Sequence, residues 1–161
     1  MGREETGWRR YENANLPYDR GNINGGGAGQ FSAPIKDQNG RTIATLPCQR
    51  PPWSRLTAVN ANTGKIAWQT TLGTTDALPE GKRSTGGAGS AGPIATASGL
   101  IFIGAATDNR FRAFESKTGK ELWAVKLERT ANAVPITYQG KNGKQYVAVT
   151  ATDTLIVFAL P

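Results

Sequence analysis

The sequence predicts an all-β fold made of repeated four-stranded antiparallel sheets, and three observations support this prediction. The 161 residues include 20 Gly and 9 Pro, with 38% hydrophobic and 19% charged residues, a composition that favours short strands and turns over helical bundles. Apolar residues alternate with polar ones in short segments that turn residues separate. One of these segments also occurs twice in the chain.

The repeated segment is a turn followed by a strand that contains tryptophan. TGKIAWQTTLG begins at Thr63, and TGKELWAVKLE begins 55 residues later at Thr118. The alignment extends upstream over two alternating strands, LTAVN and FRAFE. Each copy is therefore a predicted β-hairpin whose turn glycine supplies a positive φ. Trp68 and Trp123 occupy equivalent positions in the two copies.

Further strands surround the second hairpin. Upstream, GPIAT and GLIFIGA predict two strands around a small turn, and LIFIG is an apolar run typical of a strand buried on both faces. These segments give four antiparallel strands between Gly92 and Leu127. Downstream, VPITY, QYVAVTA and TLIVFAL predict three strands of a last unit that stops there.

Four strands in a period of roughly 40 to 55 residues are typical of a β-propeller, in which each unit is one blade. A sandwich would not need such similar hairpins at a fixed offset. In a propeller the large flat rings of Trp68 and Trp123 would fill the seams between neighbouring blades. The predicted organisation is an irregular lead-in over residues 1–30, a partial blade over 31–75, a Gly-rich connection over 76–91, a complete blade over 92–128, and a final blade without its outer strand over 129–161.

The predicted number of blades is too small for a closed ring. Propellers close with about four to eight blades, whereas this sequence accounts for about two and a half to three. Closed propellers often take the missing outer strand of the last blade from the other end of the chain, and uncovered blade edges tend to pair with other strands. We therefore expect either the C-terminal part of a larger protein or a chain that associates with copies of itself.

Several classes of chemistry are excluded by the composition. The chain has no histidine, which excludes Ser-His-Asp and Cys-His relays and any histidine-ligated metal within it. Cys48 is the single cysteine, so neither an internal disulfide nor a Cys-x-x-Cys motif is possible. No apolar run is long enough to span a bilayer, and the first residues lack the apolar core of a signal peptide. The formal charge of +7 comes from scattered Lys and Arg, which favours a solvated surface over a nucleic-acid site.

Three stretches of the sequence resemble the C-terminal blades of the pyrroloquinoline-quinone (PQQ)-dependent dehydrogenases, and most closely the quinoprotein glucose dehydrogenases. They are PPWSRLTAVNANTGKIAWQTTLG, GPIATASGLIFIGAATDNRFRAFESKTGKELW and PITYQGKNGKQYVAVTATDTLIVFALP. The turn-and-tryptophan segments look like that family's tryptophan-docking motif. The resemblance is strong over residues 51–161 and weaker over residues 21–50.

The resemblance implies an eight-bladed propeller that carries PQQ near its axis with a divalent cation, Ca²⁺ or Mg²⁺. Such enzymes transfer a hydride from a sugar or an alcohol to the quinone with the help of an aspartate base. They pass the electrons to a respiratory quinone acceptor in the periplasm. The base and most cation ligands come from blades that precede this segment in the family, so the resemblance assigns no catalytic or metal-binding residue to this chain.

The resemblance also implies cofactor-facing residues at the entries of inner strands and on the loops above them. They are Ser90, Ala91, Gly92, Asp108, Asn109 and Asn132. Each position has an alternative interpretation. The Gly-rich run also fits a flexible connection between blades, and Asp108-Asn109 also fits an ordinary hairpin turn.

The substrate and the functional class stay open at this point. The glucose-oxidising members carry a longer segment with a histidine before the final strand, whereas here TATDTLIVFALP runs on without one. The substrate could therefore be another sugar or an alcohol. A second hypothesis is a non-catalytic propeller scaffold, similar to the propeller lipoprotein of outer-membrane protein assembly. A third, a nucleic-acid binder, rests on net charge alone.

Overall fold

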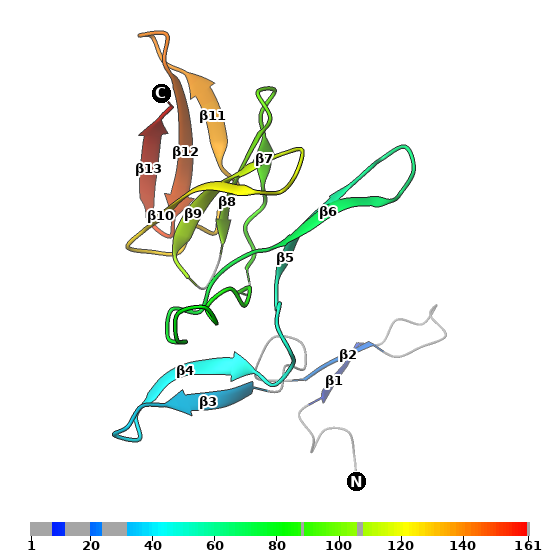
Figure 1. The fold of residues 1–161 in the computed structure, drawn as a ribbon, viewed down its shortest axis with the longest axis vertical. Coiled ribbons are helices and arrows are strands. Elements are labelled where there is room, and N and C mark those ends of the chain that lie inside the picture. The colour runs from blue at the N-terminus through cyan, green and yellow to red at the C-terminus, as the bar shows by residue number, and fades with distance from the viewer. Residues whose placement is uncertain (1–7, 12–19, 24–31, 88, 106–107, 161) are drawn as a thin grey trace. The chain divides into compact units, whose positions relative to one another are not determined.

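The computed structural model describes residues 8–11, 20–23, 32–87, 89–105 and 108–160 of the 161-residue chain. The chain divides into two compact units, Met1–Gln49 and Arg50–Pro161, and each is described by itself. All regular elements among the described residues are β-strands (Figure 1). None of the described segments forms a helix that is long and apolar enough to cross a membrane.

The first unit contains two antiparallel hairpins, β1 (Trp8–Tyr11) with β2 (Arg20–Ile23), and β3 (Ser32–Lys36) with β4 (Thr42–Pro47). The turn between β3 and β4 is held by a single carboxylate. Oδ1 of Asp37 accepts hydrogen bonds from the backbone N–H groups of Asn39 and Arg41, both at 2.9 Å. An aspartate in this position favours a turn because its side chain satisfies the backbone donors locally.

The second unit contains three antiparallel sheets. The first is the hairpin β5 (Arg55–Val59) with β6 (Ile66–Thr71), and the second has the order β10-β9-β8-β7, formed by β7 (Ile94–Ala95), β8 (Leu100–Ala105), β9 (Arg110–Glu115) and β10 (Glu121–Lys126). The third has the order β11-β12-β13, formed by β11 (Ile136–Gln139), β12 (Gln145–Ala151) and β13 (Thr154–Ala159). This arrangement confirms the all-β prediction. The unit boundary at residues 49 and 50 falls inside the predicted partial blade over 31–75, and the predicted blade boundaries stay a prediction.

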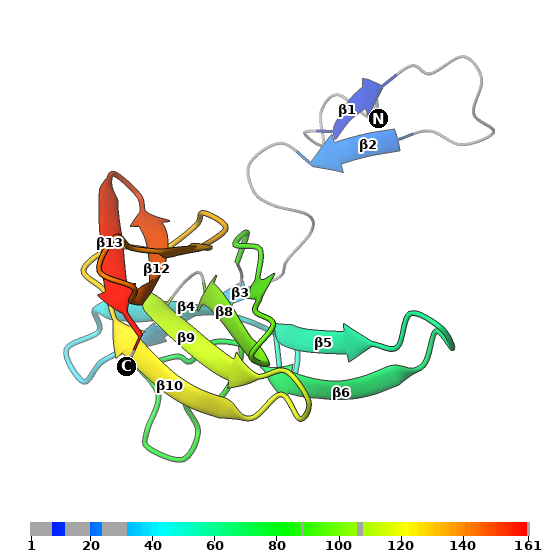
Figure 2. The same cartoon turned by 90° about the horizontal axis from the view of Figure 1, so that it is seen from above.

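Two hydrophobic clusters join these sheets, one on each face of the four-stranded sheet. Figures 1 and 2 show the ribbon of this sheet between the hairpin of β5 and β6 and the third sheet. Phe102 and Phe111 pack toward the third sheet, with Val147 and Val149 of β12 in the same cluster. On the opposite face, the second cluster contains Leu72, Ile103 and Phe114. The four-stranded sheet is therefore apolar on both faces, as the continuous apolar run of β8 predicts.

The repeated TGK sequence forms the same turn twice. The N–H of Gly64 donates to the carbonyl of Asn60 and that of Gly119 to the carbonyl of Glu115, both at 2.8 Å. The two glycines have φ angles of +68° and +72°. Because only glycine adopts this backbone conformation without strain, the repeat fixes two equivalent hairpins.

The two equivalent tryptophans lie at the seams between sheets, as predicted. Nε1 of Trp68 donates to the backbone carbonyl of Ser116 at 2.9 Å. Its ring lies on Gly119, where an added Cβ would be 2.4 Å from the ring carbon Cε3. Trp123 contacts the next sheet in turn, with its ring centroid 5.3 Å from that of Phe158 in an edge-on arrangement, and 40% of this residue stays exposed. Each tryptophan therefore packs its own hairpin against the sheet that follows it.

The outer face of the third sheet carries exposed apolar residues. The strand register places Ile136, Ala148 and Val157 in one row across this face. In the four-stranded sheet the corresponding row is Ile94, Phe102 and Ala113, and that row belongs to the cluster shared with the third sheet. Ile136 is 58% exposed and Val157 is 42% exposed. Ala148 between them is 3% exposed, so the two ends of a row that is covered in one sheet are exposed in the next.

We predict that Gly119→Ala destabilises the fold much more than Gly64→Ala. Both substitutions impose the same left-handed strain, because the two φ angles are +72° and +68°, and this costs about 1–2 kcal/mol. Only at Gly119 does the new methyl group meet an indole ring, whereas nothing lies within 4 Å at Gly64. We expect overpacking to add about 1–3 kcal/mol to the loss of unfolding free energy in urea. Equal losses for the two variants would contradict the packing of Trp68 on this turn.

Candidate functional site

Three connections carry the six residues predicted to lie near a cofactor: the segment before β7 (Ser90, Ala91, Gly92), the β8–β9 turn (Asp108, Asn109) and the β10–β11 connection (Asn132). Ser90 and Asn132 are exposed. Ala91 is half-buried against the second hydrophobic cluster. A Cβ added at Gly92 would be 2.8 Å from Cγ2 of Val134, so this position accepts only glycine without a shift of that side chain. Contact of these residues with a cofactor stays a prediction.

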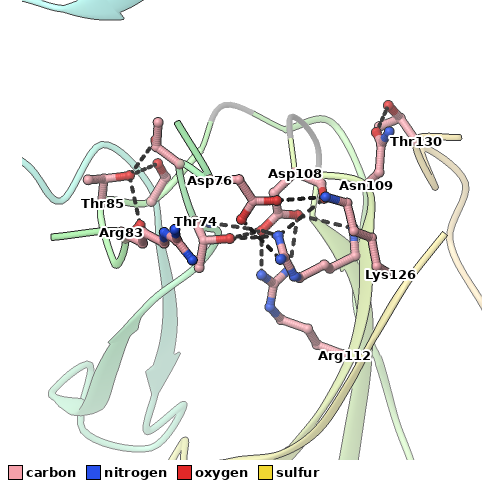
Figure 3. A network of polar contacts seen from close by, with 12 residues as sticks. Thr74, Asp76, Arg83, Thr85, Asp108, Asn109, Arg112, Lys126 and Thr130 are labelled. Carbon is pink, nitrogen blue, oxygen red and sulfur yellow. Dashed lines mark hydrogen bonds and ion pairs between the residues drawn. The ribbon is translucent and has the colours of Figure 1, made fainter. Parts of the chain in front are cut away.

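Asp108 is the centre of a polar network between the first and second sheets of the second unit (Figure 3). Its carboxylate is 1% exposed. Oδ2 accepts hydrogen bonds from the N–H of Thr74 at 2.8 Å and from Oγ1 of Thr74 at 3.0 Å. Oδ1 accepts from the N–H of Arg110 and from Nη1 of Arg112, both at 3.1 Å. Nη2 of Arg112 donates to Oδ2 as well, which makes the ion pair bidentate.

The buried guanidinium of Arg112 keeps Asp108 ionised. Burial alone would raise the pKa of Asp108, but the hydrogen bonds and positive charge of Arg112, together with the two donors of Thr74, lower this pKa below its ordinary value. Arg112 also donates through Nε to Oε2 of Glu121 at 3.0 Å. The network is thus charge-paired, and the ionised carboxylate of Asp108 already accepts five hydrogen bonds. In this arrangement it is not free to serve as a general base.

A second carboxylate, Asp76, joins the same region from the surface. Nη2 of Arg110 lies 3.0 Å from Oδ1 of Asp76, and Nζ of Lys126 lies 2.7 Å from Oδ2. The hydrogen bonds from Lys126 and Arg110 lower the pKa of Asp76 to about 2. Nη1 of Arg110 also donates to Oγ1 of Thr74 at 2.9 Å. The two carboxylates are therefore linked through one arginine and one threonine.

Asn109 connects the β8–β9 turn to the β10–β11 connection. Its backbone has a φ of +53°, a conformation that asparagine tolerates better than most residues. Its carbonyl accepts from the N–H of Leu127 at 2.7 Å, and its Oδ1 accepts from Oγ1 of Thr130 at 2.6 Å. The turn interpretation of Asp108-Asn109 is therefore supported. The turn is bonded to the segment after β6 through Asp108 and to the segment after β10 through Asn109.

The sequence pointed to Asp108 and Asn109 but missed their partners. Thr74 lies 34 positions upstream of Asp108, and no local pattern links the two. Arg112 did carry a signal, because FRAFE places an arginine inside an otherwise apolar alternating strand. A buried arginine requires a paired carboxylate, and the nearest upstream acid is Asp108, four positions away.

The described residues contain no cluster of side chains that could hold a metal ion. Within residues 8–11, 20–23, 32–87, 89–105 and 108–160, no group of three or more acidic, histidine or cysteine side chains is placed to hold a metal. In the same part of the chain, every buried side-chain nitrogen or oxygen has a hydrogen-bond partner.

Comparison with known protein families identifies the fold and the family. The family model PQQ, described as "Glucose/ethanol/alcohol dehydrogenase, beta-propeller domain", matches residues 5–147. The chain belongs to this family. Membership confirms the β-propeller fold and the resemblance to PQQ-dependent dehydrogenases that the sequence motifs indicated.

Individual relatives are oxidoreductases of considerably greater length. The large subunit of glycerol dehydrogenase from Gluconobacter thailandicus is 37% identical over 91% of this chain and 23% of its own length. Quinate/shikimate dehydrogenase (quinone) from Acinetobacter baylyi is 41% identical over 73% of this chain and 16% of its own. A solved europium-containing methanol dehydrogenase shares 35% identity, with a TM-score of 0.46 over 59% of this chain and 14% of its own. The chain thus spans less than a quarter of the length of these relatives.

We predict that Asp76→Asn lowers stability at neutral pH and that this loss disappears in acid. The pKa of Asp76 is lowered from 3.8 to about 2, so its ion pairs stabilise the fold above pH 3.8 and are lost as the pH falls through about 2. Because the side chain is 38% exposed, we expect a loss below about 1 kcal/mol at pH 7. Urea unfolding across this pH range measures the difference.

Glu80→Gln provides the control for this experiment. Glu80 lies on the same connection as Asp76 and makes no ion pair within the described residues. The Glu80→Gln substitution removes the same charge from the chain as Asp76→Asn, so it reports the effect of net charge alone. A pH-dependent loss of the same size in Glu80→Gln would contradict the role given to the contacts of Asp76.

Proposed function

We propose that this chain is part of the propeller of a quinone-dependent dehydrogenase that oxidises the CH–OH group of a sugar or an alcohol. The observation that carries the proposal is the family match over residues 5–147. In such an enzyme PQQ accepts the hydride and a respiratory acceptor takes the electrons, while the protein binds and orients both reactants. The eight-bladed ring, the Ca²⁺ or Mg²⁺ ion and the periplasmic location belong to the same proposal.

The relatives favour a polyhydroxylated substrate. Glycerol dehydrogenase large subunits from two Gluconobacter species align with 91% of this chain, and a quinate/shikimate dehydrogenase is 41% identical. Two quinoprotein glucose dehydrogenases are 37% and 33% identical. Glycerol, quinate and glucose all present several hydroxyl groups on neighbouring carbons. We therefore propose a polyol, a cyclic polyol acid or a sugar as the substrate class.

This chain would contribute blades and loops rather than the reacting groups. Among the described residues, no group of three or more acidic, histidine or cysteine side chains is placed to hold a metal, and the carboxylate of Asp108 is already engaged by five hydrogen bonds. We propose that Ser90, Ala91, Gly92, Asn109 and Asn132 face the axial funnel of the complete propeller. Asp108 would lie at the edge of that funnel, with its carboxylate engaged as described above.

The activity test compares two proteins in a dye-linked oxidation assay with PQQ and Ca²⁺ or Mg²⁺. We expect no turnover of glycerol, quinate, glucose or ethanol by the 161-residue chain, because the base and the cation ligands lie elsewhere. We expect turnover by a longer protein that contains this chain and the preceding blades. Turnover by the 161-residue chain alone would overturn this division of roles.

A quinone titration of the longer protein separates the enzyme from a scaffold. Saturable quinone binding that requires a divalent cation supports the dehydrogenase. This binding is measured by the quenching of tryptophan fluorescence. Absence of both binding and turnover would favour the scaffold hypothesis, which the family match does not favour.

We propose that the outer face of the third sheet packs against a further blade of the same propeller. Its row Ile136, Ala148 and Val157 occupies the positions by which the four-stranded sheet packs against the third sheet. Exposed apolar rows on a sheet face are otherwise unfavourable in water. A neighbouring blade with a complementary apolar face would cover this row.

We predict that the 161-residue chain self-associates through this bare face and that Val157→Lys increases the monomer fraction. Val157 is 42% exposed at the β13 end of the row, so a charge there opposes burial against another sheet. Sedimentation measures the mass distribution. Thr154→Lys is the control, because it adds the same charge at an exposed position of the same strand outside the row. A clean monomer for the unsubstituted chain would contradict the prediction.

A further inference from the structure

The connection that follows β6 forms a loop whose two ends are joined by backbone hydrogen bonds. The N–H of Gly86 donates to the carbonyl of Gly73 at 3.0 Å, and that of Gly87 donates to the carbonyl of Leu72 at 2.9 Å. Residues 74–85 therefore form a loop whose two ends lie side by side. Backbone packing at this base is tight, because a Cβ added at Gly86 would be 2.4 Å from the backbone nitrogen of Ser54.

The beginning of this loop is attached to the four-stranded sheet, and its end leads into the Gly-rich run before β7. Thr74 bonds to Asp108, and Asp76 pairs with Arg110 and Lys126, so all three sheet residues come from β9, β10 or the turn before β9. After the loop, the chain continues to Gly92 and then to β7 of the same sheet. Figure 3 shows the side chains of Thr74, Asp108 and Arg112 pointing toward one another.

The side chain of Thr74 links the two charged groups of this contact. Its Oγ1 donates to Oδ2 of Asp108 at 3.0 Å and accepts from Nη1 of Arg110 at 2.9 Å. A hydroxyl is suited to this position because it both donates and accepts. Serine offers the same group, whereas valine has nearly the same shape and offers neither.

The carboxylate of Asp108 has no acceptor capacity left for another ligand. Two carboxylate oxygens provide about four lone-pair positions, and five hydrogen bonds from Thr74, Arg110 and Arg112 already occupy them. Any influence of Asp108 on a ligand must therefore pass through the groups that it holds. Arg112 belongs to β9 and is held in the same sheet as Asp108. Thr74 follows β6 of the neighbouring sheet, so its position is the one that depends on its contact with Asp108.

We propose that Asp108 and Thr74 form a clasp that positions Gly86 and Gly87, the two glycines that close the loop over residues 74–85. Asp108 is in this view a positioning residue that acts through Thr74 and the loop over residues 74–85. The clasp is a property of the folded chain and does not require a cofactor. The clasp would also hold the predicted cofactor-facing residues before β7 in place, and this consequence for catalysis rests on the proposed function.

The clasp is tested by amide hydrogen exchange on the 161-residue chain and its Thr74→Val and Thr74→Ser variants. Thr74→Val removes two hydrogen bonds to charged groups and keeps the backbone bond to Asp108. We expect exchange at the amides of Thr75, Gly86 and Gly87 to rise about tenfold. Thr74→Ser should restore the slow exchange, and Glu80→Gln should leave it unchanged. The amides of Val147 and Val149 in β12 serve as the internal reference for global opening.

Three results would overturn the clasp. Unchanged exchange at residues 75, 86 and 87 in Thr74→Val would show that the hydroxyl does not hold the loop. The same rise in Thr74→Ser as in Thr74→Val would show that the methyl group, and not the hydroxyl, matters. An equal rise at Val147 and Val149 would show a general loss of stability in place of a local release. None of these results bears on the dehydrogenase activity, which the dye-linked assay of the longer protein tests separately.

Discussion

A four-stranded sheet that is apolar on both faces requires a neighbour on each side, and this constraint organises the second unit. The sheet of β7 to β10 meets it twice, through Phe102 and Phe111 on one face and Ile103 and Phe114 on the other. The neighbouring sheets are therefore not optional additions, because they cover surface that would otherwise be exposed to water. The same constraint explains why the outer face of β11 to β13 carries apolar residues. It has the composition of an interface, and in a propeller the covering element is the next blade.

Hydrophobic contact alone does not set how the sheets are aligned along their seam, and two directional contacts do so. Near the outer hairpins, Trp68 covers Gly119 and donates to the carbonyl of Ser116. At the strand ends, Thr74 is held by Asp108. A buried ion pair such as Asp108–Arg112 contributes little net stability because of its desolvation cost, but its removal on one side leaves an uncompensated charge. Its value here lies in fixing one arrangement of the loops.

The proposed place of this chain in a dehydrogenase rests on its family match. Its family match and its relatives concern enzymes of which it spans less than a quarter. Among the described residues, every buried side-chain nitrogen or oxygen of the polar network has a hydrogen-bond partner. Such a network can hold loops in place around a cofactor, while the reacting base and the cation ligands would come from other blades. The proposed division of labour is therefore between a positioning segment and a reacting segment of one propeller.

The sequence by itself determined the hairpins, their repetition and the family. Turn glycines with positive φ, alternating strands and tryptophans at a 55-residue offset are local features, and local features survive in the one-dimensional pattern. It also left the role of Asp108-Asn109 open between a turn and a cofactor site. Only the tertiary structure decided that Asp108 meets Thr74 across 34 positions and that Trp68 donates to Ser116 across 48. These partners are brought together by the packing of one sheet on another, and no spacing in the sequence encodes which loop will lie opposite a given turn.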